Sequence, residues 1–203
     1  MSPRPRETSD ADILAAAARA VSRLGPAKLT LAEVAAEARV SAATLVQRFG
    51  SKRQLLLALA ASASGDLERE FAEIRAAART PLDAVYGVGD CMAAMAKTPE
   101  MLSNGLAFLQ IDLVDPDFHR LALAHARKMR VEIKKLLDEA VRSRELRPGG
   151  TARLAQAIAG MLSGSLLQWA IERDGTARKR LRADLETLLE ARTRRSRAAR
   201  ASR

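Results

Sequence analysis

Three helix starts within a short span constrain this chain more than any other feature. Residues 29–59 read LTLAEVAAEARVSAATLVQRFGSKRQLLLAL, and a hydroxyl residue stands at each expected start, at Thr30, Ser41 and Ser51. Such side chains accept hydrogen bonds from the free amides of a helix N-terminus. After Thr30 and Ser51, a Glu or Gln three residues later completes a capping box. The segment is therefore predicted to form short, closely connected helices that present one helix to something outside.

A helix-turn-helix is the expected arrangement of these short helices. An earlier helix starts at Ser9 or Asp10 and ends at Gly25-Pro26, and the two short helices cover about residues 30–38 and 41–49. The apolar positions that would hold the small core are Leu31, Val34, Ala35, Ala38, Val40, Leu45 and Phe49. The positions that would face outward are Ala43, Thr44, Gln47 and Arg48.

The rest of the chain is expected to be helical as well, which makes the fold all-α. The core must be built mainly from Leu, Ala, Val and Met, because aromatic residues make up only 3% of the chain. No sustained alternation of apolar and polar residues indicates a sheet. We expect a helix-turn-helix domain over residues 1–54, of which 1–8 form a disordered basic arm, a larger helical domain over 55–191, and an Arg-rich tail over 192–203.

The positive charge lies entirely at the two ends of the chain. Residues 1–53 hold nine Lys and Arg against five Asp and Glu, and residues 192–203 hold six Arg and no acid. Residues 54–191 hold nineteen of each sign, so they contribute nothing to the net charge of +10. A balanced body with basic ends indicates segments that bind a polyanion. A solvated, disordered tail is the alternative for residues 192–203.

One segment is long and uncharged enough to be compared with a membrane span. Residues 154–171 carry no charge for about 18 residues, which is near the usual minimum. They contain Gln156, Ser163, Ser165 and Gln168, and a helix buried between protein surfaces explains this composition better than lipid does. The single cysteine, Cys91, and an N-terminus without an apolar signal-peptide core favour a cytoplasmic protein with no membrane partner.

The helix-turn-helix segment resembles the N-terminal DNA-binding part of TetR-family transcriptional regulators. The family pattern is Thr, an Ile/Val-Ala pair, Ala-Gly-Val-Ser, Thr-Leu-Tyr, an aromatic residue, Ser-Lys and a leucine pair. The chain matches this pattern at Thr30, Val34-Ala35, Ala38, Val40-Ser41, Thr44-Leu45, Phe49, Ser51-Lys52 and Leu55-Leu56. It departs at the turn glycine, which is Arg39, at the tyrosine, which is Val46, and at a histidine, which is Arg48.

The resemblance implies a sequence-specific DNA-binding transcriptional regulator rather than an enzyme. The N-terminal domain would precede a larger helical domain for ligand binding and dimerisation. The protein would act as a homodimeric, ligand-responsive repressor on a near-palindromic operator in double-stranded DNA. A basic architectural protein that binds DNA without sequence choice is one alternative, and a helical enzyme that uses a central cavity is another.

The resemblance places the second helix of the motif in the major groove of DNA. Ala42 and Ala43 could contact a thymine methyl group, whereas Thr44, Gln47 and Arg48 are the polar candidates for bases or phosphates. Ordinary caps and solvated charges are the alternative interpretation of these residues. The full set of expected DNA-binding residues is Thr30, Ser41, Ala42, Ala43, Thr44, Val46, Gln47, Arg48 and Lys52.

Two C-terminal helices carry the expected dimer interface. Gly160 and Gly164 are four residues apart, so they share one helical face and permit close backbone approach. TetR-like proteins dimerise through a bundle of four such helices, and the alternative is a seam inside a monomer. The expected interface residues are Gly160, Gly164, Leu167, Ile171, Leu181, Leu185 and Leu188.

The resemblance also implies a pocket among the middle helices for an unidentified small-molecule effector of apolar character. The candidate lining residues are Tyr86, Met92, Met95, Phe108, Leu109, Met129 and Trp169. Ordinary core packing is the alternative for each of them.

No metal, cofactor or catalytic group is expected. His119 and His125 are six residues apart on a helix and face different directions, so they cannot share a metal ion. Asp115 and Asp117 are explained by a helix start around Pro116. The sequence shows no phosphate-binding loop and no nucleophile paired with a base.

Overall fold

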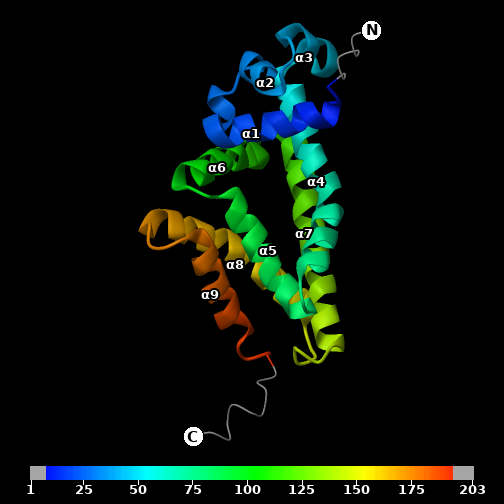
Figure 1. Cartoon of the computed structure of the whole chain (residues 1–203), viewed down its shortest axis with the longest axis vertical. Helices are drawn as coiled ribbons and strands as arrows, with labels where there is room; N and C mark the ends of the chain where they lie inside the picture. Colours follow the sequence, from blue (N-terminus) through cyan, green and yellow to red (C-terminus); the bar gives the residue numbers. More distant parts are fainter. Residues whose placement is uncertain (1–7, 194–203) are drawn as a thin grey trace, which may run out of the picture. The chain divides into compact units, whose positions relative to one another are not determined.

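The structure, a computed structural model, describes residues 8–193. Those residues form nine α-helices (Figure 1), which confirms the predicted all-α fold. The helices are α1 (Asp10–Lys28), α2 (Leu31–Ala38), α3 (Ala42–Phe49), α4 (Lys52–Ala77), α5 (Pro81–Met95), α6 (Pro99–Val114), α7 (Pro116–Arg142), α8 (Thr151–Glu172) and α9 (Ala177–Leu189). The predicted basic arm, apart from Thr8, and the predicted Arg-rich tail from Arg194 onward lie outside the described residues.

Two compact units make up the chain. The first contains residues up to 66 together with 100–125, and the second contains residues 67–99 and those from 126 onward. The long helices α4 and α7 each contribute one part to each unit. Residues 100–125 therefore belong with the N-terminal helices, and the division of the chain into domains at residue 54 stays a prediction.

The first unit is built on helix starts that the sequence marks clearly. Ser9 forms a capping box with Asp12, and Thr30 forms one with Glu33, in which the Thr30 Oγ1 accepts from the Glu33 amide at 3.2 Å. These helices enclose one apolar core, which confirms the positions expected to hold it. Its buried members are Ile13, Ala17, Ala20, Val21, Leu29, Val34, Ala35, Leu45, Leu55, Leu56 and Phe118.

Gly25 kinks α1 where the sequence predicts that the helix ends. Its backbone has φ +76° and ψ 159°, a left-handed φ that only glycine adopts without cost, and a short helical turn follows as far as Lys28. A Cβ atom at this position would lie 2.8 Å from the Oδ1 atom of Asn104. The Asn104 Nδ2 donates to the Ser22 carbonyl at 2.8 Å, so α6 is held against the end of α1 where no side chain intervenes.

Arg39 ends α2 in the left-handed conformation, with φ 57° and ψ 42°. Its amide donates to the carbonyls of Ala35 and Ala36, which closes the last turn of the helix. A residue with a Cβ atom pays on the order of 1 kcal/mol for this geometry compared with glycine. The turn of the helix-turn-helix therefore has a left-handed residue at the position where the family pattern has glycine, although this residue is Arg39.

In the second unit, α5 packs against α8 and α9 at a glycine. A Cβ atom at Gly89 would lie 3.0 Å from Leu185 and 3.5 Å from Leu162, so the absence of a side chain sets how closely these helices approach. Leu162, Leu181 and Leu185 are fully buried there. This packing places α9 along α5 and gives the second unit much of its core.

The second unit also buries one carboxylate between α4 and α7. Glu132, only 3% exposed, pairs with Arg75 at 3.3 Å and with Lys135 at 2.5 Å. Burial by itself would raise the pKa of Glu132, but the two cations outweigh it and hold the pKa below its ordinary value. The ion pairs therefore keep the buried carboxylate charged.

Two glycine-to-alanine substitutions are expected to change stability in opposite directions. Gly25→Ala should lower the free energy of unfolding by more than about 1 kcal/mol, because φ is positive and the new methyl group meets Asn104. Gly65→Ala should raise it by roughly 0.5–1 kcal/mol, because this helical position has open space around it. Urea denaturation measures the free energy of unfolding of both variants. Equal changes in the two variants would contradict the positive φ and the close contact with Asn104 at Gly25.

Candidate nucleic-acid interface

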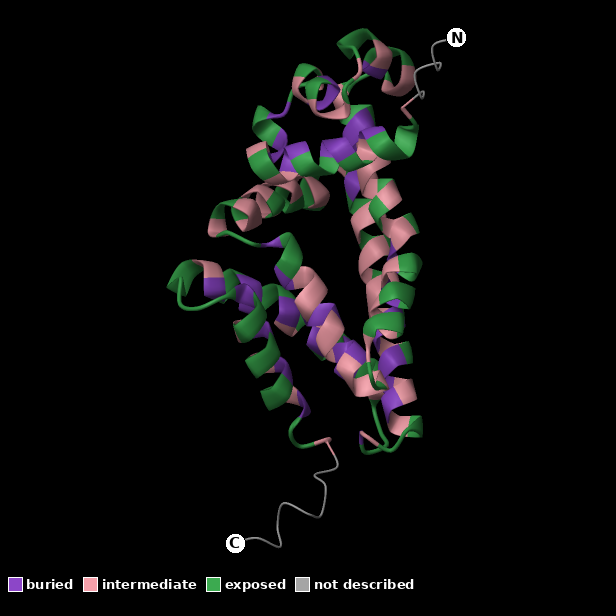
Figure 2. Cartoon of the chain, in the orientation of Figure 1, coloured by how far each residue is buried: buried purple, intermediate pink, exposed green. Residues whose placement is uncertain are grey.

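The helix α3 is held by one face and exposed on the other. Leu45 is fully buried and Phe49 is half-buried in the core of the first unit, and the Ser41 Oγ accepts from the Thr44 amide at 3.0 Å at the helix start. Ala42, Ala43, Val46 and Gln47 are exposed. Figure 2 shows how exposed and buried segments are distributed over the helices. The outward face is therefore apolar over its first turn and carries one long polar side chain after it.

Gln47 is the exposed polar side chain of α3 that has no protein partner in the described part of the chain. Thr44 is half-buried, and its hydroxyl lies 2.8 Å from that of Ser41, so it is already engaged at the helix cap. Val46 is 51% exposed at the position where the family pattern has a tyrosine. The amide of Gln47 is therefore the group of this face best placed to form hydrogen bonds to something outside.

Arg48 is turned toward the start of α1. Its guanidinium donates to the Thr8 carbonyl and to the Asp10 carboxylate, the latter at 3.3 Å, and its side chain is only 25% exposed. These contacts tie the last turn of α3 to the first turn of α1. The sequence could not predict them, because nothing local links residues that are 40 positions apart.

Thr30 and Lys52, which are also among the expected DNA-binding residues, have partners inside the protein. The Thr30 hydroxyl accepts from the Glu33 amide and donates to the Glu33 carboxylate at 3.1 Å. The Lys52 Nζ donates to the Ala27 carbonyl at 3.2 Å. Thr30 remains exposed and Lys52 half-buried, so both lie at the surface while they fix the start of α2 and of α4.

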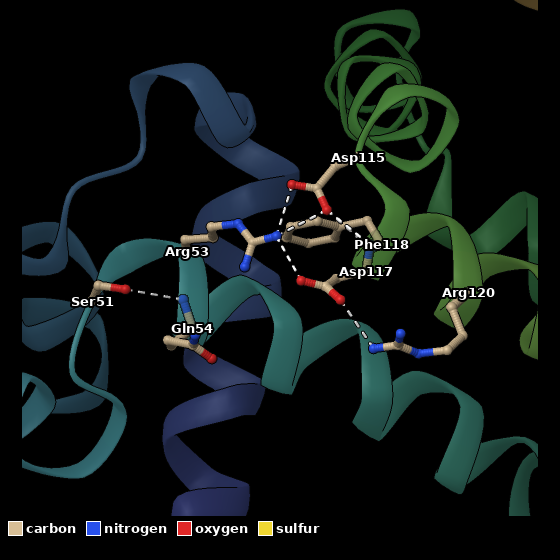
Figure 3. Close-up of polar contacts among 7 residues, drawn as sticks. All are labelled: Ser51, Arg53, Gln54, Asp115, Asp117, Phe118 and Arg120. Atoms are coloured by element: carbon tan, nitrogen blue, oxygen red, sulfur yellow. Dashed lines mark hydrogen bonds and ion pairs between the residues drawn. The ribbon is translucent and has the colours of Figure 1, made fainter.

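Arg53, at the start of α4, joins the helix-turn-helix to the start of α7 (Figure 3). Its Nη2 donates to both carboxylate oxygens of Asp115, at 2.9 and 2.8 Å, and to Asp117 at 2.9 Å. The guanidinium carbon also lies 5.7 Å from the ring centre of Phe118, within the range of a cation–π contact. We call Arg53, Asp115 and Asp117 the Arg53 clamp.

The Arg53 clamp also organises the start of α7. The Asp115 Oδ1 accepts from the amide of Asp117 at 2.9 Å, which confirms the predicted helix-capping role of this aspartate. The hydrogen bonds from Arg53 hold the pKa of both carboxylates below the ordinary value. The sequence pattern identifies the aspartates as part of a helix start but gives no sign of Arg53, because Arg53 is 62 and 64 residues away from them.

The seven residues expected to line a pocket lie in different surroundings. Phe108 and Leu109 belong to the first unit and the other five to the second. Phe108 packs edge-on against Phe118 with ring centres 5.8 Å apart, and the guanidinium of Arg182 lies 5.3 Å from the ring centre of Tyr86. Met92 and Met129 are half-buried, whereas Met95 and Leu109 are exposed.

Trp169 lines an open cavity of about 510 Å³ in the second unit. Its indole Nε1 donates to the Gly175 carbonyl at 3.2 Å, and the cavity wall also carries Lys97 and Arg178. None of the other six expected pocket residues lines this cavity. The expected apolar pocket therefore stays a prediction.

The residues expected at a dimer interface divide into two groups. Gly160, Gly164, Leu167 and Ile171 are exposed along one side of α8, and Ile171 is 67% exposed. Leu181 and Leu185 are fully buried within the second unit, and Leu188 is half-buried. The first group is free to meet a partner, whereas Leu181 and Leu185 belong to the core of the protomer.

By length and composition, α8 is apolar enough to cross a membrane. A core helix of a water-soluble protein can have the same length and composition, so these two properties alone decide nothing. Ile158, Leu162 and Leu166 are buried on one side of the helix inside the second unit. This burial agrees with the expectation that the uncharged segment packs against protein.

Within residues 8–193, no group of three or more His, Cys, Asp or Glu side chains is placed to hold a metal ion. Asp115 and Asp117 face the guanidinium of Arg53.

Two parts of the chain match known protein families. Residues 13–59 match the family described as "Bacterial regulatory proteins, tetR family", and residues 88–194 match "BetI-type transcriptional repressor, C-terminal". The chain is 31% identical over 159 residues to the HTH-type transcriptional regulator BetI of Agrobacterium fabrum, and the match covers 77% of this chain and 74% of the relative.

Solved structures share the fold at low sequence identity. A TetR transcription regulator from Haloarcula marismortui has a TM-score of 0.73 and 14% identity, covering 91% of this chain and 98% of the other. A putative transcriptional regulator from Saccharomonospora viridis, solved in complex with choline, has a TM-score of 0.73 and 18% identity, covering 92% and 98%.

Replacing Arg53 with Met is expected to destabilise the protein at neutral pH and to matter less in acid. The lowered pKa values mean that Asp115 and Asp117 contribute stability above their unfolded pKa, about 3.9. That contribution is lost as the pH falls through the lower folded-state values. Urea denaturation of wild type and variant between about pH 7 and about pH 2.5 measures the difference.

Arg79→Met is the matched control, because Arg79 is exposed and has no partner in the described residues. The free energy of unfolding of Arg79→Met should stay close to that of wild type at every pH. If Arg53→Met lowers the free energy of unfolding by the same amount at every pH, the ion pairs of the Arg53 clamp do not contribute to stability as proposed.

Proposed function

Because the chain belongs to the TetR family of bacterial regulatory proteins and carries a BetI-type C-terminal domain, we propose that it represses transcription as a cytoplasmic homodimer bound to a near-palindromic operator. The family consists of DNA-binding, ligand-responsive transcriptional regulators and not of enzymes. The observation that carries the proposal is α3, which buries Leu45 and exposes the opposite face.

The exposed face of α3 suits the major groove. Ala42 and Ala43 offer small apolar contacts that fit a thymine methyl group, and their size lets the helix approach the bases closely. The Gln47 amide can donate to and accept from adenine at the same time. Arg48 acts mainly by fixing α3 against α1, because its guanidinium is already engaged there.

The exposed side of α8 is the proposed dimer interface. Gly160, Gly164, Leu167 and Ile171 follow one another at spacings of four, three and four residues, which places them along a single helical face. A Cβ atom at either glycine would meet nothing within 4 Å, so a second helix has room to approach. A two-fold dimer would set two α3 helices roughly 34–36 Å apart, one turn of DNA.

The response to a small molecule requires two states of the dimer that bind the effector with different affinities. A ligand that binds the DNA-competent state less tightly would release the operator, with a coupling of about 1–3 kcal/mol. The relative from Saccharomonospora viridis was solved with choline, so choline is the first effector to test on this chain. Release of a bound operator duplex on addition of choline would identify it.

Selection from a random pool of duplex DNA should enrich a two-fold-symmetric sequence. Gln47→Ala should then weaken the preference for one base pair in each half-site by roughly tenfold, because the amide reads that base. Gln110→Ala, which removes an exposed glutamine from α6, is the control and should leave the selected sequence unchanged.

Enrichment of no sequence, despite tight binding that weakens with salt, would contradict the proposed repressor. It would indicate a protein that binds DNA without sequence choice.

Ile171→Glu should convert the dimer to a monomer, because it places a charge in the proposed apolar interface, where Ile171 is 67% exposed on the protomer. Val131→Glu is the control, since Val131 is 51% exposed on α7 and lies outside the proposed interface. Sedimentation velocity measures the mass of both variants. Dimers that persist in Ile171→Glu at micromolar concentration would place the interface elsewhere.

A further inference from the structure

The cations around the helix-turn-helix are not equally free to bind DNA. Four cationic residues lie between Thr30 and the first turn of α4: Arg39, Arg48, Lys52 and Arg53. Arg48 donates to Thr8 and Asp10, Lys52 to the Ala27 carbonyl, and Arg53 to Asp115 and Asp117. Arg39 is exposed and has no side-chain partner in the described part of the chain.

Arg39 also has a backbone conformation that is unfavourable for any residue with a side chain. It adopts φ 57° in the turn between α2 and α3, where glycine would carry no steric cost. A favourable interaction with the C-terminal end of α2 offsets part of that cost, because cations are stabilised there. The side chain stands two residues before Ser41, the cap of α3.

We propose that Arg39 contacts a DNA phosphate next to the groove that α3 enters. A guanidinium donates two parallel hydrogen bonds to phosphate oxygens, and Arg39 can do so without breaking a contact inside the protein. The inference rests on the DNA-binding function proposed above and adds a residue to it. The turn of the motif therefore gives up some stability in the free protein and gains a phosphate contact in the complex.

The experiment compares the salt dependence of DNA binding by wild type and by Arg39→Gly. The probe is a fluorescein-labelled duplex of about 30 base pairs and mixed sequence, titrated at several salt concentrations. Each lost phosphate contact should reduce the slope of log affinity against log salt by about 0.9. If wild type and Arg39→Gly have equal affinity at about 1 M salt, this change in slope makes the variant bind roughly eightfold more weakly at about 0.1 M salt, for each protomer bound to DNA.

Thermal stability should move the opposite way from DNA affinity. Arg39→Gly removes the strained side chain, so its Tm should rise by about 2–4 °C while its affinity falls. Arg39→Lys keeps the positive charge and should retain the wild-type salt slope. A variant that simply folded badly would lose both stability and affinity, which contradicts the proposal.

Arg173→Gly is a matched control. Arg173 is also an exposed arginine in the left-handed conformation, with φ 55° at the end of α8, and it has no side-chain partner in residues 8–193. The substitution removes the same charge and the same backbone strain outside the helix-turn-helix. It should leave the salt slope unchanged.

The outcomes separate this inference from the proposed function. Wild-type binding with an unchanged slope for Arg39→Gly, or an equal loss of slope for Arg173→Gly, would overturn the inference alone. No salt-dependent binding by wild type would overturn the proposed function and the inference together.

Discussion

Hydrogen bonds at helix starts stabilise the short helices of the helix-turn-helix, on which the proposed DNA contacts depend. The helices α2 and α3 have eight residues each, and helices of that length are unstable on their own in water. The hydroxyls of Thr30 and Ser41 satisfy amides that no carbonyl of the same helix can reach. With Leu45 buried beneath α3, these caps fix the direction in which the exposed side chains of that helix point.

The features of this fold that can be predicted from the sequence are those whose determining signal is local. The caps at Thr30 and Ser41 and the buried position of Leu45 follow from residue type and helical spacing, and the structure agrees with each. The partners of Arg48 and Arg53 could not be found in this way. Their contacts join separate helices, and only the tertiary path of the chain brings them together.

The same limit explains how the leucines near the C-terminus divide. Spacing identifies an apolar helix face, but it does not say whether another part of the protomer or a second copy covers that face. Leu181 and Leu185 meet α5 at Gly89, where the missing side chain lets α9 come close. The glycines of α8 have no such neighbour and lie in open space.

Phe118, from the start of α7, completes a core that is otherwise built mainly by the N-terminal helices. This ring is 2% exposed in the same core as Ile13 and Leu45, yet the whole of α4, α5 and α6 separates it from Leu45 along the chain. As the chain emerges from the ribosome, the three N-terminal helices appear long before the residue that completes their core. Newly made helix-turn-helix segments therefore wait, incompletely packed, until the start of α7 has been translated.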